Sequence, residues 1–281
     1  MLTRSSGYLT LSSAPVPTSV ASLQADGYLV LSGVFDQDEM AILRADVERV
    51  FEEYPPDQRG DDYLPGHWAP FRYEMLNRSA PVQRALGHPK ILEVIEPLLG
   101  EDCHVIANTA WWQRSGDNDH LGRFWHIDSG PHIPRSPDVP WDSRIPYPVF
   151  AIAAHLYLWD CPIEAGPTGV IPGSHMSGQS PPVRQLNRDD LEWEGQGVRP
   201  IVAKAGDVAL FVSDVWHRRL PPGPGDPGRM FVQCHYGRRG IAQRLRPTSE
   251  VNHLSEEALA RAETAREKTL IGYHPLSFYD G

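Results

Sequence analysis

The chain has 281 residues and a formal charge of −10, from 26 lysines and arginines against 36 aspartates and glutamates. A single catalytic domain with helical flanks suits this length, since all-β barrels often reach about 200–250 residues. No cationic run exceeds Arg218-Arg219 and Arg238-Arg239, which disfavours nucleic acid or an anionic membrane as partner. Three cysteines without a CxxC pair disfavour a disulfide framework or a zinc–thiolate site.

No targeting or membrane-spanning segment is expected. Residues 1–20 are rich in Ser, Pro and Thr, lack an apolar stretch of signal-peptide length, and are predicted to be flexible. The strongest apolar run, residues 149–159, contains His155 and falls well short of the ~20 residues that a membrane span needs. It is better interpreted as a central strand buried on both faces. We therefore expect a cytoplasmic protein that does not bind membranes.

A first helix is predicted to begin after Asp36. Asp36 and Glu39 have the spacing of a capping box, which satisfies free N–H groups of the first helical turn. Apolar residues then recur at helical spacing until Pro55-Pro56, which cannot continue a helix. A second helix is predicted over residues 88–100, opened by a His-Pro pair. Both helices are interpreted as packing braces against one sheet.

Residues 21–281 are predicted to form a single domain. A helical brace over 36–100 would precede a β core over about 103–240, and a helical extension would follow over 250–281. Within the extension, residues 255–269 are rich in Glu, Ala and Arg and predict a short exposed helix. No internal repeat or low-complexity linker separates these parts.

Short strands separated by Gly and Pro are predicted throughout the β core. Such a pattern is typical of a sandwich or barrel. The spacing of the candidate metal ligands favours the double-stranded β-helix, which is the jelly-roll of cupins and oxygenases. The predicted strands are 103–114, 124–128, 149–159, 169–171, 197–203, 208–216 and 230–236.

The most specific chemical pattern is His126-Ile127-Asp128. In an extended strand, residues two apart point to the same face, so His126 and Asp128 would face one ion while Ile127 points away. Residues 207–217 predict a strand that ends in His217. Two imidazoles and one carboxylate on one side of a metal form the facial triad of non-haem Fe(II) oxygenases. That triad leaves open positions for a co-substrate and dioxygen.

Arg229 opens the next predicted strand, 12 residues after His217. A planar guanidinium can hold both oxygens of a carboxylate, so Arg229 is a candidate ligand for the distal carboxylate of a keto-diacid. His155 and His235 are interpreted as structural residues, because a satisfied core histidine is more common than a functional one.

Residues 164–175 read Glu-Ala-Gly-Pro-Thr-Gly-Val-Ile-Pro-Gly-Ser-His and lie between the predicted metal strands. With the order of the triad and Arg229, this segment resembles the phytanoyl-CoA dioxygenase-like family of Fe(II)/2-oxoglutarate oxygenases. That family carries a similar Asn-Gly-Pro-Leu-x-x-Ile-Pro-Gly-Ser-His segment. Two positions depart from it. Ala165 stands where Asn or Gly is common, and Thr168 stands where Leu is common. The resemblance spans about residues 20–240.

The resemblance implies that the triad binds Fe(II) and that Arg229 binds the C5 carboxylate of 2-oxoglutarate. Arg219 stands where relatives often have a hydroxyl residue, and Thr168 is expected to supply that hydroxyl instead. Gln113, Thr168 and Arg219 are thus further candidate co-substrate contacts, whereas His126, Asp128 and His217 are the implied iron ligands.

The implied activity is oxidation of an unactivated C–H bond in a small-molecule metabolite. Dioxygen is consumed, 2-oxoglutarate is converted to succinate and CO2, and ascorbate is expected to support the activity in vitro. Asp128 favours hydroxylation or another oxidation over halogenation, since halogenating relatives have a small residue at that position.

Two loops are predicted to cover the metal. A proline-dense stretch, residues 129–148, starts directly after the His-x-Asp strand, and long loops inside compact domains are usually functional. Residues 60–73 form the second loop. The candidate substrate contacts are His132, Arg135, Trp141 and Arg144 in the first loop and Trp68 in the second.

Two alternatives of other classes remain open from the sequence. A cupin-like metal enzyme that does not use 2-oxoglutarate, such as an isomerase or a ring-cleaving dioxygenase, would keep the triad but have no use for Arg229. A non-catalytic jelly-roll binding protein would have no use for a complete triad. Neither the substrate nor the oligomeric state can be deduced from these patterns.

Overall fold

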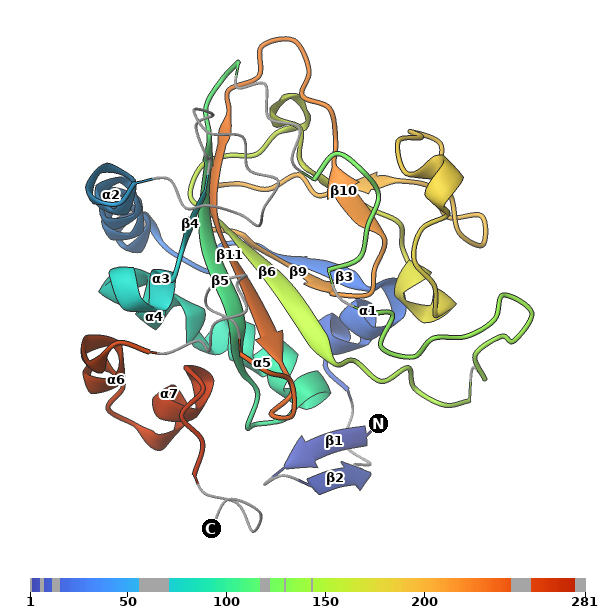
Figure 1. Ribbon diagram of the computed structural model, residues 1–281, viewed down its shortest axis with the longest axis horizontal. Helices are drawn as coiled ribbons and strands as arrows, with labels where there is room; N and C mark the ends of the chain where they lie inside the picture. Colours follow the sequence, from blue (N-terminus) through green and yellow to red (C-terminus); the bar gives the residue numbers. More distant parts are fainter. Residues whose placement is uncertain are drawn as a thin grey trace.

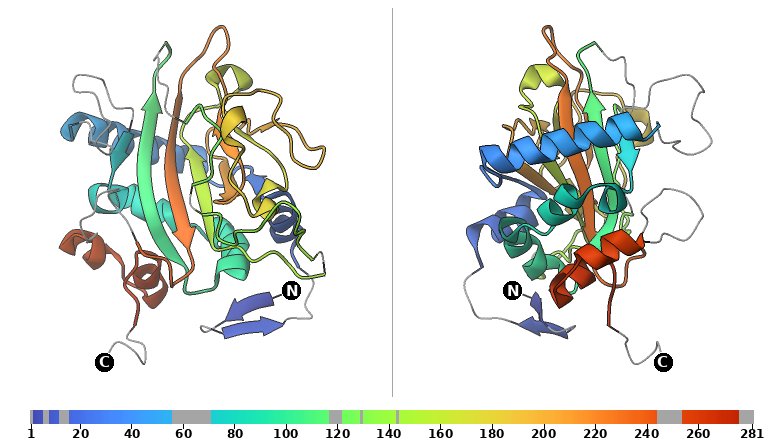
Figure 2. Two further views of the ribbon diagram at one scale, coloured as in Figure 1. Left: turned by 45° about the vertical axis from the view of Figure 1, so that its right-hand side comes forward. Right: turned by 90° about the vertical axis from the view of Figure 1, so that its left-hand side faces the viewer.

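The structure is a computed structural model that describes residues 2–5, 8–11, 16–55, 71–116, 122–128, 130–142, 144–243 and 254–275 (Figure 1). Its centre is a six-stranded antiparallel sheet, with a smaller three-stranded sheet on one side (Figure 1). Helices cover the opposite side of the larger sheet (Figure 2). This mainly β arrangement with flanking helices is that of a jelly-roll, as the sequence predicts.

The larger sheet has the strand order β3-β9-β6-β11-β5-β4, so chain neighbours are rarely sheet neighbours. All five pairings are antiparallel. In chain order its strands are β3 (Tyr28–Leu31), β4 (Phe71–Tyr73), β5 (His104–Gln113), β6 (Ala151–Tyr157), β9 (Val208–Val212) and β11 (Arg229–Gly237).

The smaller sheet pairs β10 (His217–Arg219) with β7 (Thr168–Val170), and β7 with β8 (Arg199–Pro200). The predicted strand from 207 to His217 is therefore wrong as one element. β9 ends at Val212, where the Ser213 N–H bonds to the Ala151 carbonyl at 3.0 Å and the Val215 N–H turns back to Val212 at 2.9 Å. His217 opens a strand of the other sheet, a crossing that an apolar pattern does not reveal.

The predicted strand 124–128 is extended but is not part of a ladder. His126 and His217 exchange two backbone hydrogen bonds of 3.0 Å, and the Asp128 N–H bonds to the Ser213 carbonyl at 3.0 Å. The Trp125 N–H instead bonds to the Leu186 carbonyl at 2.7 Å. Successive residues thus bond to partners in different segments, and only His126 forms a β-bridge.

The predicted helix after Asp36 is confirmed, including its capping box with Glu39. The helix over 88–100 is confirmed as well, with His88 as its N-cap. Residues 255–269 form two short helices rather than one, and each buries an apolar residue, Ala258 and Leu270. The helices are α1 (Thr18–Asp26), α2 (Gln37–Glu53), α3 (Met75–Arg78), α4 (Ala80–Leu86), α5 (Pro89–Leu99), α6 (Glu256–Arg261) and α7 (Ala265–Leu270).

Three 3-10 turns, Ile163–Ala165, Ser174–Ser177 and Val183–Gln185, lie in the connections of the smaller sheet. Near the N-terminus, β1 (Leu2–Ser5) and β2 (Tyr8–Leu11) form an antiparallel pair of their own. Across the described residues, no helix is both long and apolar enough to cross a membrane.

Strand β11 shows how the sheet divides the molecule. Alternate residues point to opposite faces of a strand. Met230, Val232, Cys234 and Tyr236 are fully buried in the large apolar cluster that includes the helices. The intervening residues point to the other face, between the two sheets. The described cysteines are all buried and free, as expected.

Candidate metal centre

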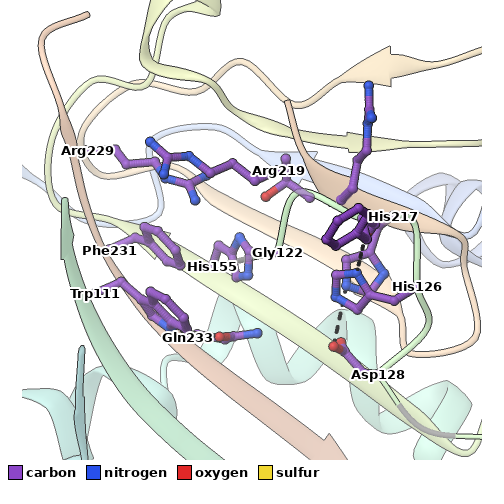
Figure 3. A pocket seen from close by; sticks show the side chains of 13 residues that line it. Trp111, Gly122, His126, Asp128, His155, His217, Arg219, Arg229, Phe231 and Gln233 are labelled. Carbon is purple, nitrogen blue, oxygen red and sulfur yellow. Dashed lines mark hydrogen bonds and ion pairs between the residues drawn. The ribbon is translucent and has the colours of Figure 1, made fainter. Parts of the chain in front are cut away.

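Three predicted metal ligands converge between the two sheets. One potential ligand atom from each of His126, Asp128 and His217 lies within 4.8 Å of the other two. The segment 122–128 supplies the first two, and His217 opens β10. The β-bridge between His126 and His217 holds the two imidazoles together, with ring centroids 4.3 Å apart (Figure 3).

The backbone sets the tautomer of both imidazoles. His126 Nδ1 lies 2.7 Å from the Phe124 carbonyl, and His217 Nδ1 lies 2.9 Å from the Val215 carbonyl. A carbonyl can only accept, so each Nδ1 carries a proton and each Nε2 is the nitrogen left to bind a metal. Fixing one nitrogen in this way orients the other toward a metal. The donor set is thus two imidazoles and one carboxylate, which suits Fe(II).

Asp128 is held as a carboxylate. Burial alone would raise its pKa, but the imidazoles of His217 and His235 outweigh burial and bring the pKa well below its usual range. His217 Nε2 lies 3.4 Å from Asp128 Oδ1, whereas His235 Nε2 lies 2.9 Å from Asp128 Oδ2. One oxygen therefore faces the other ligands while His235 on β11 can donate a hydrogen bond to the second.

A cavity of about 340 Å³ extends from these ligands between the sheets. Its walls combine aromatic rings with three arginines, and Asp128 is the carboxylate among the lining residues. It is lined by Trp111, Gly122, Phe124, His126, Asp128, His155, Thr168, His217, Arg218, Arg219, Arg229, Phe231 and Gln233 (Figure 3).

Arg229 lies on the opposite side of this cavity from the triad (Figure 3). Its Nε donates to Gln113 Oε1, the residue paired with it in the β5–β11 register. Its Nη1 donates to the Gly166 carbonyl at 3.0 Å, and its Cζ lies 5.1 Å from the centre of the Phe231 ring. These contacts fix the guanidinium where it faces the cavity, as a carboxylate anchor requires.

The other predicted co-substrate contacts lie around Arg229 but differ in exposure to the cavity. Thr168 on β7 and Arg219 on β10 line the cavity and are paired in the β7–β10 register. Gln113 is fully buried and, among the residues that the structure describes, is not part of the lining. Its amide instead orients Arg229.

An aromatic wall lies beside Arg229. The rings of Trp111 and Phe231 are nearly parallel, with an interplanar angle of 4° and centroids 6.1 Å apart. Trp111 Nε1 donates to Gln233 Oε1 at 2.8 Å, which fixes the indole. Trp112 points to the opposite face, where it packs on Phe51. One of the two neighbouring tryptophans thus faces inward and the other outward, as alternation predicts.

Two histidines that the sequence analysis assigned to structure lie in the site. His235 contacts Asp128, and His155 on β6 lines the cavity. Alternation along β11 was the missed signal, because Arg229, Phe231, Gln233 and His235 are spaced by two and share one face. For His155 the signal was weaker, since every residue of β6 is buried and the pattern does not mark an inner face.

The predicted substrate contacts in loop 129–148 lie outside the cavity lining in the described structure. His132 Nδ1 is 2.5 Å from Asp214 Oδ1, and Asp214 also accepts from the His132 N–H at 2.9 Å. Arg135 donates to the Met176 carbonyl and lies over the Trp141 ring at 5.3 Å. Arg144 pairs with Asp142, and its side chain is 87% exposed.

These contacts attach the loop to the turn that precedes His217, because Asp214 lies in that turn. The His132 ring also stacks on Phe150, with centroids 5.1 Å apart. Trp68 lies outside the described residues, as does nearly all of the predicted loop 60–73.

Comparison with known proteins places this site in context. A family model described as phytanoyl-CoA dioxygenase matches residues 23–219, well over half of the chain and inclusive of all three triad positions. The ectoine dioxygenase of Bordetella bronchiseptica is 24% identical over 220 residues, which cover 70% of this chain and 68% of that protein.

Solved structures share the fold. EctD from S. alaskensis with bound Fe superposes with a TM-score of 0.62 at 21% identity, covering 84% of this chain and 81% of that one. The epimerase SnoN from nogalamycin biosynthesis, in complex with Fe3+ and alpha ketoglutarate, gives 0.60 at 19% identity, covering 84% and 92%. The carbocyclase SnoK gives 0.55 at 20% identity, covering 82% and 85%. By its sequence match, this chain belongs to the phytanoyl-CoA dioxygenase family.

Proposed function

We propose that this protein is an Fe(II)- and 2-oxoglutarate-dependent dioxygenase that hydroxylates an unactivated C–H bond of a small-molecule metabolite. The observation that carries the proposal is a single cavity with His126, Asp128 and His217 on one side and Arg229 on the other. A cupin-like enzyme that does not use 2-oxoglutarate would need the metal triad but would have no use for Arg229.

The chain's residues have separable tasks in this proposal. His126, Asp128 and His217 hold the metal from one side and leave its remaining positions to ligands. Arg229 binds the distal carboxylate of 2-oxoglutarate, which would cost several kcal/mol to bury without a partner. When bound, iron and 2-oxoglutarate couple the conversion of 2-oxoglutarate and dioxygen into succinate and CO2 to the oxidation of a C–H bond.

The walls of the cavity orient the substrate and exclude water. Trp111, Phe231 and Phe124 supply apolar area, while Arg218, Arg219 and Gln233 supply hydrogen-bond donors. Water exclusion prevents loss of reactive species to side reactions. An arrangement of aromatic rings with several donors suits a metabolite that combines an apolar or planar body with acceptor oxygens.

The type of product that forms at the C–H bond can be measured directly. Relatives of this fold include an epimerase and a carbocyclase, so product analysis should cover stereoinversion and ring closure as well as hydroxylation. Ectoine is a suitable first compound in a screen because two of the sequence relatives are ectoine dioxygenases.

The defining experiment measures succinate release with Fe(II), ascorbate, 2-oxoglutarate and a metabolite panel, for wild type and Arg229→Ala. A hydrogen bond to a charged group is worth ~1.5–3 kcal/mol, so Arg229→Ala should raise the 2-oxoglutarate requirement about tenfold or more. Fe(II) affinity should stay near wild type, because the three ligands are untouched.

Arg229→Lys and Arg219→Ala are the matched variants. Lys keeps the positive charge but lacks the planar guanidinium, so Arg229→Lys should recover part of the lost affinity for 2-oxoglutarate. If Arg229→Ala retains wild-type affinity while Arg219→Ala loses it, Arg219 is the anchor. If neither variant changes the 2-oxoglutarate requirement, neither arginine is the anchor. If wild type shows no succinate release that depends on 2-oxoglutarate, the proposed function is wrong.

A further inference from the structure

His155 on β6 is buried without a hydrogen-bond partner. The residue is 5% exposed, and neither ring nitrogen has a partner among the described residues. Its nearest aromatic neighbours are Phe231 and Phe211, with ring centroids 4.6 Å and 5.0 Å away. These rings hold the imidazole by packing, and His155 is among the residues that line the cavity.

Such an arrangement is costly unless a ligand satisfies it. An imidazole in its neutral form carries one N–H donor and one acceptor. Burial, and then the positive charge of Arg229, brings the pKa of His155 well below its usual value, so the ring is neutral at physiological pH. Buried polar groups without partners are rare in native proteins, and each calls for an explanation such as a bound ligand.

The strand register places His155 between the two ends of the cavity. His155 pairs with Gln233, which lies four residues beyond Arg229 on β11 and two residues before His235. At about 3.3 Å per residue, this level lies between the guanidinium and the histidine that contacts Asp128. Figure 3 shows the same order, with His155 between Arg229 and Asp128.

We propose that His155 is a direct contact of 2-oxoglutarate and donates its ring N–H to an oxygen of the co-substrate. The inference rests on the proposed function, since a keto-diacid that joins the metal to Arg229 must pass this level of the sheet. Every oxygen of that dianion is an acceptor, which matches a neutral imidazole with one N–H to donate. Gln233, its cross-strand neighbour, has its amide oxygen bonded to Trp111.

The test measures 2-oxoglutarate binding rather than turnover. Anaerobic Fe(II)-loaded protein is titrated with 2-oxoglutarate, and binding is followed by calorimetry and by the visible charge-transfer absorption of the complex. His155→Phe keeps a planar ring and removes both nitrogens, whereas His155→Gln keeps an N–H donor. His104→Phe is the control, because His104 is a buried histidine of the same sheet that does not line the cavity in the described structure.

The proposal predicts that His155→Phe weakens 2-oxoglutarate binding about tenfold or more, as expected for a lost hydrogen bond to a charged group. His155→Gln should restore most of that loss, and His104→Phe should bind like wild type. Fe(II) affinity should be equal in all four proteins. A role of His155 in packing alone would leave His155→Phe close to wild type and make His155→Gln the poorer binder, and that result would overturn the inference.

Two further outcomes separate the inference from the proposed function. If wild type binds 2-oxoglutarate and Arg229→Ala does not, while His155→Phe binds normally, the inference is wrong and the proposed function survives. If iron-loaded wild type does not bind 2-oxoglutarate at all, both fail.

A measurement on wild type avoids any dependence on the folding of the Phe variant. In Zn(II)-loaded protein with nitrogen-15 histidine, adding 2-oxoglutarate should shift one ring N–H signal and slow its exchange with solvent. The signal is assigned to His155 by its absence in His155→Gln. An unchanged His155 signal at saturating 2-oxoglutarate would refute the contact.

Discussion

The two faces of the six-stranded sheet carry opposite kinds of residues on the same strands. On β6, Leu156 points into the apolar cluster beneath the helices, whereas His155 points into the cavity. On β11, Val232 likewise points into the apolar cluster and Gln233 into the cavity. The outer face supplies stability through buried apolar area. The inner face holds the groups that a ligand can satisfy.

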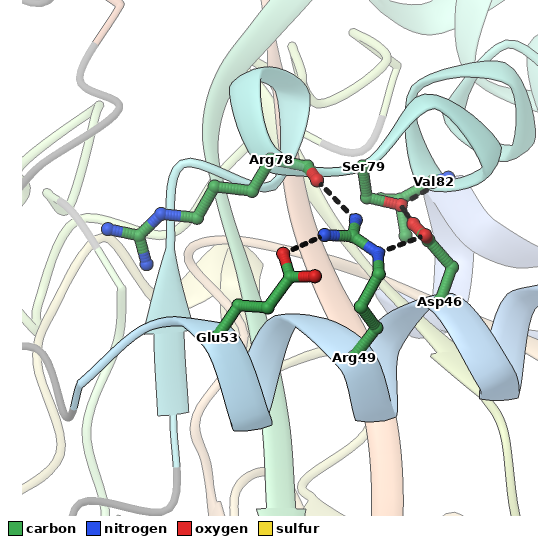
Figure 4. A network of polar contacts seen from close by, with 6 residues as sticks. All are labelled: Asp46, Arg49, Glu53, Arg78, Ser79 and Val82. Atoms are coloured by element: carbon green, nitrogen blue, oxygen red, sulfur yellow. Dashed lines mark hydrogen bonds and ion pairs between the residues drawn. The ribbon is translucent and has the colours of Figure 1, made fainter.

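On the helical side, one network pairs several polar side chains within the protein. Arg49 on α2 donates to Asp46 at 2.8 Å, to Glu53, and to the carbonyl of Arg78 at 2.8 Å (Figure 4). Ser79 donates to Asp46 and accepts from the Val82 N–H, which caps α4 (Figure 4). This network joins α2 to the α3–α4 turn. Neither ring nitrogen of His155 has such a partner among the described residues, although His155 lines the cavity.

The largest expected effect is on the inner face. Asp128→Ala should abolish turnover, because removing one ligand from a three-ligand site changes both the affinity for iron and its geometry. The melting temperature of the metal-free protein should remain close to wild type, since the apolar core lies on the other face. Near-normal turnover of Asp128→Ala, measured as succinate release, would exclude the facial triad.

The reciprocal change on the outer face is Leu156→Ala. Truncating a buried leucine costs about 2–5 kcal/mol, so denaturant unfolding should show a large loss of stability. Under conditions where the variant is folded, its affinities for Fe(II) and 2-oxoglutarate should match wild type. A variant that loses ligand affinity while it keeps its stability would contradict the division between the faces.

A smaller effect is expected at His235, which holds the ligand carboxylate of Asp128. Loss of such a supporting hydrogen bond typically lowers metal affinity about 10–100-fold. His235→Ala should therefore weaken Fe(II) binding in calorimetry within that range, and His235→Asn should be milder if its amide reaches the same oxygen. Unchanged Fe(II) affinity in His235→Ala would show that the contact does not support the metal.

The sequence predicted the chemistry of the site better than its local structure. His126, Asp128, His217 and Arg229 were singled out by residue type and order, and the structure brings them to one cavity. The elements that carry the triad were not correctly predicted. β9 ends at Val212, and a turn over residues 213–216 leads to β10 in the other sheet, a change of sheet that the sequence pattern does not reveal.

Contacts that depend on strand register could not be predicted from the sequence. His155 and His235 acquire their places only when β6 and β11 pair, and register is a property of the folded sheet. The short elements α1, β3, β4, α3 and α4 were also missed, since runs of three to nine residues carry little periodic signal. The loop residue His132 was singled out as a substrate contact, and the structure places it on Asp214.

The backbone carbonyls that orient the imidazoles of His126 and His217, the candidate metal ligands, have an evolutionary consequence. Phe124 supplies its carbonyl to His126 while its 60%-exposed side chain lines the cavity. A main-chain oxygen is present whatever residue occupies a position, so the side chain at 124 can be exchanged without cost to the tautomer of His126. The wall of the cavity can thus diversify under selection while the arrangement of the candidate metal ligands is inherited unchanged.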